Sequence, residues 1–248
     1  MQISMNELKA SLRRCFEANG YFSGNFEDAA DMILWLEQHG FEGVKELAKV
    51  LPYIHQDGDK PLITIAYEDQ ISVTIDAHHR SSLNCMAVAV DLIHTKAMKS
   101  GLVMATIKNC HNRKVVLQTL SYCGSRGISA VAYWCNGSEN ITEHTAMIKA
   151  GEALPSYSMA TSTHAAQDGD HQSLTLICSS RVDLTSSLPA IRNYPEQYHF
   201  TPTQLASSKE KTISQGIHID EAIWAEINRI GAGVLVENSD RSRMGAGN

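Results

Sequence analysis

Residues 101–137, GLVMATIKNCHNRKVVLQTLSYCGSRGISAVAYWCNG, decide the expected fold. An apolar run from Val103 to Ile107 leads into the polar segment 108–113, then into a helical apolar pattern, and then into a second apolar run from Ile128 to Trp134. This order predicts a strand, a helix and a second strand parallel to the first. Ligands of α/β sheets bind beyond the carboxyl ends of such strands, and the polar segment KNCHNR falls at such an end.

Two interpretations of this polar segment remain open. His111, Asn112 and Arg113 would add hydrogen-bond donors to the unpaired N–H groups of a helix start, and Asn109 precedes them, so the turn is a candidate anion site. The alternative is a solvated turn in which Asn112 serves as the helix N-cap. A G-x-G-x-x-G motif is absent from the sequence, which argues against a standard Rossmann site.

A second polar group follows the strand pattern ISVTID of residues 71–76. Asp76, His78, His79 and Arg80 crowd the end of that strand and are suited to act as acid, base and carboxylate clamp. An exposed polar turn explains them equally well. Adjacent histidines on a regular strand point to opposite faces, so both reach one ligand only if the chain bends there.

Composition narrows the class of protein. The 248 residues are 43% hydrophobic and 19% charged, which is enough to bury a core. The net charge of −6 comes without any basic block, so nucleic acid is not expected as the main partner. No apolar run reaches the length of a membrane span, and no signal peptide is visible, so we expect a cytoplasmic protein with no membrane partner.

The six cysteines form no C-x-x-C pair, so neither a disulfide framework nor a zinc site is predicted, and no metal is expected. Cys110 and Cys123 stand near basic residues, which lower the pKa of a thiol, and this makes them candidate reactive thiols. The sequence assigns no base to either of them.

The chain is predicted to divide into four parts: an N-terminal helical arm (1–55), an α/β core domain (56–200), C-terminal helices packing on the core (201–236) and a mobile tail (237–248). Within the arm, Ser4 and Asn25 are expected to cap the first two helices. Within the core, we expect a hairpin from LITIAY and ISVTID, a helix from Leu83 to Lys99, and a short helix from Ile141 to Ala150.

The segments ISMNELKASL and LEQHGFEG, with the long stretch from ISVTIDAHHRSS to AVAYWCNG, carry a family resemblance over residues 3–137. Here the chain resembles the malate/L-lactate dehydrogenase-like family of non-Rossmann, NAD(P)-dependent reductases of 2-oxo and cyclic imino acids. The pattern NEL…EDAADMILWLEQHG and the tail SDRSRMGAGN are more similar to a small bacterial family of unknown function. The resemblance implies an α/β (mixed α+β) core with an N-terminal helical arm, truncated relative to the family, and a homodimer formed through the N-terminal helices.

The resemblance also suggests roles for the two polar groups. The family's G-H-S-G-type turn near the nicotinamide corresponds here to N-C-H-N, which keeps a histidine and loses both glycines. The family's Ser-His-Gly motif, whose histidine serves hydride chemistry, is absent from the corresponding stretch HGFEGVKEL. The expected site therefore has His111 and His78 as catalytic residues, Asn109, Asn112 and Arg113 as cofactor-binding residues, and His79 and Arg80 as substrate-binding residues.

These observations favour a small-molecule-binding protein of dehydrogenase-like descent, with NAD or NADP as the implied cofactor. Three versions of that function remain open: an oxidoreductase of 2-oxo or imino acids, a non-catalytic metabolite-binding or regulatory subunit, and a non-redox enzyme on the same scaffold.

Overall fold

The computed structural model describes residues 1–54, 61–137, 141–162, 172–187 and 197–234. Its helices are α1 (Met5–Ala18), α2 (Ser23–Gln38), α3 (Gly43–Ala48), α4 (Ser82–Ser100), α5 (Val116–Ser125), α6 (Leu184–Ser187), α7 (Pro202–Gln215) and α8 (Glu221–Gly231), with 3₁₀ turns η2 (Arg113–Val115) and η3 (Ala232–Val234). Its strands are β1 (Gln2–Ile3), β2 (Thr64–Glu68), β3 (Ser72–Ser81), β4 (Leu102–His111), β5 (Ser129–Asn136), β6 (Ile141–Ile148), β7 (Ser156–Ser162), β8 (Leu174–Ser179), β9 (Gln197–Phe200) and β10 (Ile217–His218).

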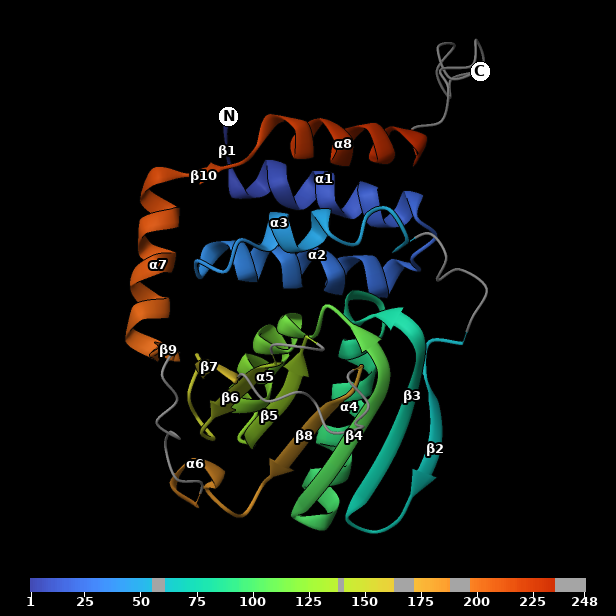
Figure 1. Cartoon of the computed structure of the whole chain (residues 1–248), viewed down its shortest axis with the longest axis vertical. Helices are drawn as coiled ribbons and strands as arrows, with labels where there is room; N and C mark the ends of the chain where they lie inside the picture. Colours follow the sequence, from blue (N-terminus) through green and yellow to red (C-terminus); the bar gives the residue numbers. More distant parts are fainter. Residues whose placement is uncertain (55–60, 138–140, 163–171, 188–196, 235–248) are drawn as a thin grey trace, which may run out of the picture.

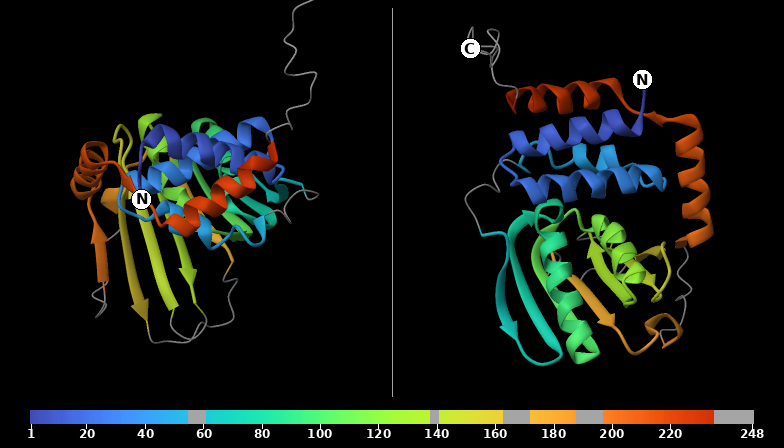
Figure 2. Two further views of the ribbon diagram at one scale, coloured as in Figure 1. Left: turned by 90° about the horizontal axis from the view of Figure 1, so that it is seen from above. Right: turned by 180° about the vertical axis from the view of Figure 1, so that it is seen from behind.

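The centre of the structure is an eight-stranded sheet of order β2-β3-β4-β8-β5-β6-β7-β9. Strands β3 and β4 pair in parallel, and the other paired neighbours of this sheet run antiparallel. Helix α4 is the crossover between the two parallel strands, while α4 and α5 together cover one face of the sheet (Figure 2). The predicted hairpin is confirmed as β2–β3, and the predicted helix from Leu83 is confirmed as α4, which Ser81 caps.

The strand–helix–strand order predicted for residues 101–137 is confirmed, but the pairing differs. Strands β4 and β5 point the same way, yet β8 lies between them and pairs antiparallel with both. The strand inserted between them comes from about forty residues later in the chain, so the local pattern held no signal for it.

The helix expected from Ile141 to Ala150 is wrong. This segment forms β6, which pairs with β5 on one side and β7 on the other. His144, Ala146 and Ile148 are buried while their neighbours Thr145 and Met147 are partly exposed, so the burial period is two residues, as a strand requires.

Of the two predicted caps in the arm, one is confirmed. Ser4 and Glu7 form a reciprocal capping box at the start of α1. Asn25 does not cap α2, which begins at Ser23; its side chain instead donates to Asn84 Oδ1 at 3.0 Å and so links α2 to α4.

Helices α1, α2, α3 and α8 form a layer beyond the end of the sheet towards which β3 and β4 point (Figure 1). The C-terminal helices were expected on the α/β core, but α8 lies against α1, and α7 contacts α2. Ser11 of α1 donates to Asn228 of α8 at 2.9 Å, which fixes this contact. The predicted tail lies outside the described residues.

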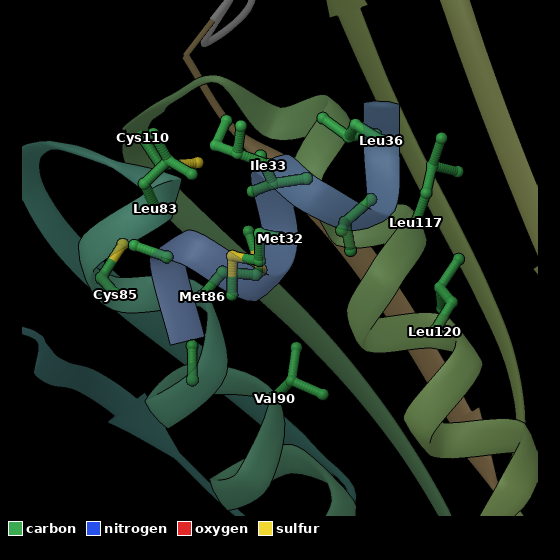
Figure 3. Close-up of a cluster of buried hydrophobic side chains, with 14 of the residues drawn as sticks. Met32, Ile33, Leu36, Leu83, Cys85, Met86, Val90, Cys110, Leu117 and Leu120 are labelled. Atoms are coloured by element: carbon green, nitrogen blue, oxygen red, sulfur yellow. The ribbon is translucent and has the colours of Figure 1, made fainter. Parts of the chain in front are cut away.

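One apolar interface joins the helical layer to the core (Figure 3). Helix α2 packs against α4 and α5, and Figure 3 shows its side chains seated between those two helices. The buried side chains here are Met32, Ile33, Leu36, Leu83, Met86, Val90, Leu117 and Leu120. Each fully buried side chain of this size contributes about 1.5–3 kcal/mol, so this contact dominates the docking of the arm.

The turn from α2 into α3 allows a direct test of this packing. A Cβ on Gly43 would overlap the Ile33 carbonyl oxygen and lie 2.9 Å from the Glu37 nitrogen, both of them backbone atoms of α2. We expect Gly43→Ala to lower the free energy of unfolding by about 1–3 kcal/mol, because the backbone of one helix must move.

Gly24→Ala is the matched control, because Gly24 is also helical and has open space where the Cβ would lie. We expect it to raise stability by about 0.5–1 kcal/mol. Urea unfolding followed by circular dichroism measures both changes, and equal stability of the two variants would contradict the close packing of α3 on α2.

Candidate functional site at the ends of β3 and β4

Both polar groups found in the sequence lie at one edge of the sheet. Parallel pairing places Arg80 opposite Cys110 and Ser81 opposite His111, so the two strands end side by side. This edge faces the helical layer (Figure 1). The structure therefore brings the two separately predicted groups together, at the carboxyl ends where α/β proteins bind ligands.

The backbone at this edge is unusual. His78, His79, Asn109 and Asn112 have φ values of 53°, 58°, 54° and 56°, and they are four of the five non-glycine residues with positive φ in the described part of the chain. The left-handed conformation costs about 1–2 kcal/mol per L-residue and less for asparagine. Strained residues of this kind gather at functional sites, where surrounding contacts hold them.

The two left-handed histidines form a bulge in β3. The register slips between Asp76 and Arg80, so β3 carries extra residues opposite Asn109 of β4. The bend sends the imidazoles to different neighbours: His78 Nε2 lies 2.8 Å from Thr64 Oγ1, and His79 Nδ1 lies 2.9 Å from Gln172 Oε1.

Asp76 ties the bulge to the end of β4. Its carboxylate accepts from the His78 backbone N–H at 2.8 Å and from Asn109 Nδ2 at 2.9 Å. The hydrogen bond from Asn109, followed by that from the His78 backbone, holds the pKa of Asp76 below its ordinary value. Asp76 is therefore ionised at neutral pH and positions the two turns; it is not suited to be a general acid.

Arg80 lies inside the protein. It is 3% exposed, and its Nε donates to the Pro61 carbonyl at 2.8 Å. The carboxylate clamp that the sequence suggested stays a prediction, and little of Arg80 faces solvent.

The end of β4 is held from two sides. Ser81 Oγ donates to Asn112 Oδ1 at 3.1 Å and accepts from the Leu83 N–H, so one hydroxyl links the β4 turn to the start of α4. Asn112 occupies the N-cap position of η2, as one of the two interpretations expected, but its side chain makes no capping hydrogen bond. The His111 ring meets the ring of Tyr53 edge-on, with centroids 5.7 Å apart.

Arg113 begins a hydrogen-bonded chain that the sequence did not predict. Its guanidinium donates to the Ser173 carbonyl and to Asn136 Oδ1. Asn136 Nδ2 lies 2.9 Å from His144 Nε2, and His144 Nδ1 lies 2.8 Å from the Tyr157 hydroxyl. Since Asn136 donates to Nε2, the proton of the neutral imidazole is on Nδ1. No local sequence pattern indicated this chain, because its members come from η2, β5, β6 and β7.

Burial keeps His144 and Tyr157, the two titratable groups at the far end from Arg113, uncharged at neutral pH. His144 stacks on Trp134 with centroids 4.8 Å apart, and burial, with Lys114 and Arg113 nearby, lowers the pKa of His144 to about 4. Burial also raises the pKa of Tyr157 above its ordinary value. The neighbouring Lys114 is paired with Glu46 of α3 at 2.7 Å, which ties the helical layer to this edge.

The two candidate thiols of the sequence lie near the end of β4 and in α5. Cys110 and Cys123 are fully buried, so neither sulfur is open to a reactant in this structure. Within the described ranges, His, Cys, Asp and Glu side chains form no group of three that could hold a metal. None of the helices that the structure describes is both long and apolar enough to cross a membrane.

Comparison with known proteins supports the fold. The malate dehydrogenase of Entamoeba histolytica superposes with a TM-score of 0.68 at 10% identity, over 96% of this chain and 99% of its own. The malate dehydrogenase of Pyrococcus horikoshii OT3 superposes with a TM-score of 0.68 at 12% identity, over 96% of each chain. The Δ1-piperideine-2-carboxylate reductase of Pseudomonas syringae superposes with a TM-score of 0.63 at 12% identity, over 93% of this chain and 99% of its own. This chain has a malate dehydrogenase-like fold. That confirms the mixed α/β class predicted from the sequence, and identities this low show the fold alone.

The N-terminal resemblance is also confirmed. Residues 3–87 match a family described as a protein of unknown function (DUF3726). No curated protein matches the sequence significantly. The matched part covers the helical arm, β3 and the start of α4, and thus includes one half of the strand-end site.

The buried imidazole predicts a specific pH dependence. Because the folded-state pKa of His144 lies near 4 and the unfolded value near 6.5, the unfolded chain binds a proton over this window and the native protein does not. Stability contributed by neutral His144 is therefore present above about pH 6.5 and lost as pH falls towards 4. Between pH 7 and pH 5 the loss is about 2 kcal/mol.

Between pH 7 and pH 5, we expect the free energy of unfolding of His144→Gln to fall by about 2 kcal/mol less than that of the unsubstituted protein. Urea unfolding at the two pH values measures this difference. His199→Gln, which replaces an exposed histidine on β9, is the control. If both variants keep the pH dependence of the parent protein, His144 is not held neutral by its surroundings.

Proposed function

We propose that this chain is a small-molecule-binding protein of dehydrogenase-like descent whose ligand, a 2-oxo acid or a cyclic imino acid, binds at the ends of β3 and β4. The observation that carries the proposal is the set of four left-handed, non-glycine residues at those two ends. Their conformational cost falls at one place, the edge where α/β folds bind ligands.

Carboxylate chemistry suits the side chains at this edge. His78, His79 and His111 are hydrogen-bonding imidazoles, and a carboxylate accepts from such donors. Asp76 has its carboxylate turned to Asn109 and the His78 backbone, so its acceptors are already used in part. The solved structures with this fold include enzymes named for malate and for Δ1-piperideine-2-carboxylate, and both of those compounds are carboxylates.

The residues here do not match the requirements of a nicotinamide dinucleotide. Asn109 and Asn112 put side chains where the resembling family has glycines. The Arg113 and Lys114 cations are engaged by Asn136 and by Glu46. Within the described residues, the buried side-chain atoms that lack a hydrogen-bond partner all belong to residues outside this set of strand-end side chains. We therefore favour ligand binding without hydride transfer, and NAD(P)-dependent reduction is the alternative that the experiment must separate from it.

Thermal unfolding in the presence of ligands tests the proposal. The panel is a set of 2-oxo acids and Δ1-piperideine-2-carboxylate, each alone and with NADH or NADPH. A carboxylate at about a hundred times its Kd adds about 2.7 kcal/mol, which raises the Tm by several degrees. We expect a His79→Ala/His111→Ala variant to lose this shift, and His218→Ala, an exposed histidine on β10, to keep it.

Each outcome decides between the two functions. A shift with a carboxylate alone, lost in the double variant, supports binding at this edge. A shift that appears only with a dinucleotide, together with oxidation of NADH or NADPH, supports the oxidoreductase alternative. If no compound of the panel shifts the Tm, or if the double variant keeps the shift, the proposed site is wrong.

The homodimer implied by the family resemblance stays a prediction. We propose that it forms through the N-terminal helices, whose surface includes Phe22 at 75% exposure. Light scattering at micromolar concentration should give twice the 27.2 kDa of one chain. A monomer mass would refute the dimer without bearing on the carboxylate site.

A further inference from the structure

The end of β4 presents a cation on the face of the sheet opposite α4 and α5. Those two helices cover one face (Figure 2), and the buried side chains Val103, Ala105 and Ile107 of β4 point towards it. Because successive side chains of a strand point to opposite faces, Lys108 lies on the other face, and it is exposed. The strand-end site therefore has a positively charged residue on its solvent side.

Asp76 and His79 of β3 lie around this position. The register of the parallel pair makes Asp76 the direct neighbour of Lys108. His79 Nδ1 lies 2.9 Å from Gln172 Oε1, and the carbonyl of Gln172 accepts from the Cys110 N–H of β4. Since β4 separates β3 from Gln172, the exposed His79 side chain reaches across the end of β4, close to Lys108.

The neighbouring carboxylate does not neutralise Lys108. Asp76 accepts instead from Asn109 Nδ2 and from the His78 backbone, both of which belong to left-handed residues of the two turns. Within the described residues, Lys108 takes part in no ion pair, although an ionised carboxylate lies beside it in the register. The strained turns thus direct the Asp76 carboxylate to other donors and leave the ammonium group to solvent or to a ligand.

The other cations of this edge are engaged within the protein. Arg80 is 3% exposed. Arg113 donates to a side-chain amide of β5, and Lys114 pairs with a carboxylate of α3. In the part of the edge that the structure describes, Lys108 is the exposed cation whose charge no protein group offsets.

We infer that Lys108 binds the carboxylate of the ligand and limits that ligand to a single carboxylate. This inference rests on the proposed function, which puts a 2-oxo acid or a cyclic imino acid at the ends of β3 and β4. A lysine ammonium group has three N–H donors and no acceptor, so a carboxylate satisfies it in charge and in hydrogen bonding. The imidazole of His79 lies beside it to contact the rest of the same ligand.

Asp76 disfavours a second carboxylate. The hydrogen bond from Asn109 lowers the pKa of Asp76, so this carboxylate is ionised at neutral pH. A second negative group on the ligand would be repelled by Asp76, and the described part of this edge offers it no further exposed, unpaired cation. A monocarboxylate therefore fits this arrangement of charges better than a dicarboxylate of the same length.

Isothermal titration calorimetry of the full chain with matched probes tests the inference. The probes 2-oxopentanoate and Δ1-piperideine-2-carboxylate each carry one carboxylate. 2-oxopentanamide has the shape of the first probe without its charge, and 2-oxoglutarate has the same number of carbons with a second carboxylate. We expect the unsubstituted protein to bind the monocarboxylates about tenfold more tightly than the amide or the dicarboxylate.

Variants of Lys108 connect this preference to one residue. Lys108→Met removes the charge and should raise the Kd of both monocarboxylates about five- to tenfold, while the Kd of 2-oxopentanamide stays unchanged. Lys108→Arg keeps the charge and should restore most of the affinity. Lys99→Met is the matched control, because Lys99 is also exposed but lies in the last turn of α4, near the opposite end of β4.

The results separate this inference from the proposed function. A loss of affinity in Lys108→Met that is confined to the charged probes, and that is absent from Lys99→Met, supports the inference. If Lys108→Met binds the monocarboxylates as tightly as the parent protein, Lys108 is not the carboxylate-binding residue, and the site itself stands as long as His79→Ala/His111→Ala loses binding. Equal affinity for 2-oxoglutarate and 2-oxopentanoate overturns the limit to one carboxylate. If no probe binds the parent protein, the proposed function fails and this inference fails with it.

Discussion

The contact on which the structure depends is the apolar interface between α2 and the pair α4–α5. It seats α2 on two helices of the core, whereas the sheet meets the helical layer at its end and not at a face (Figure 1). A second apolar contact joins Phe41 of the arm to Tyr157 of β7 and Phe200 of β9. The interface also positions the residues that come after α2 in the chain: α3 presents Glu46 to Lys114, and Tyr53 meets His111. The strand-end site thus depends on the docking of one helix.

The strand-end site shows how a turn keeps its shape when glycine is replaced. Asn109 and Asn112 hold the left-handed conformations that glycine adopts most easily. Asparagine tolerates this region better than other residues, and here each amide also makes a bond that glycine lacks: Asn109 to Asp76, and Asn112 with Ser81. These bonds offset part of the conformational cost. They also place side chains over backbone that glycine would leave open.

The elements that could be predicted from the sequence are those whose determining forces are local. The β2–β3 hairpin and α4 follow from periodicity and turn residues. The two polar groups were found separately for the same reason. Their proximity in the structure depends on the register between β3 and β4, which no local sequence pattern predicts.

The incorrect predictions have a common cause in long-range contacts. Strand β8 enters between β4 and β5 from a distant segment. Residues 141–148 form a strand because β5 and β7 are available on both sides, although the segment has the composition of a short helix. The Arg113–Asn136–His144–Tyr157 chain joins residues from η2, β5, β6 and β7, and only the assembled sheet reveals it. Likewise, Asn25 would cap a helix in isolation, but in the fold it bonds to Asn84 of α4.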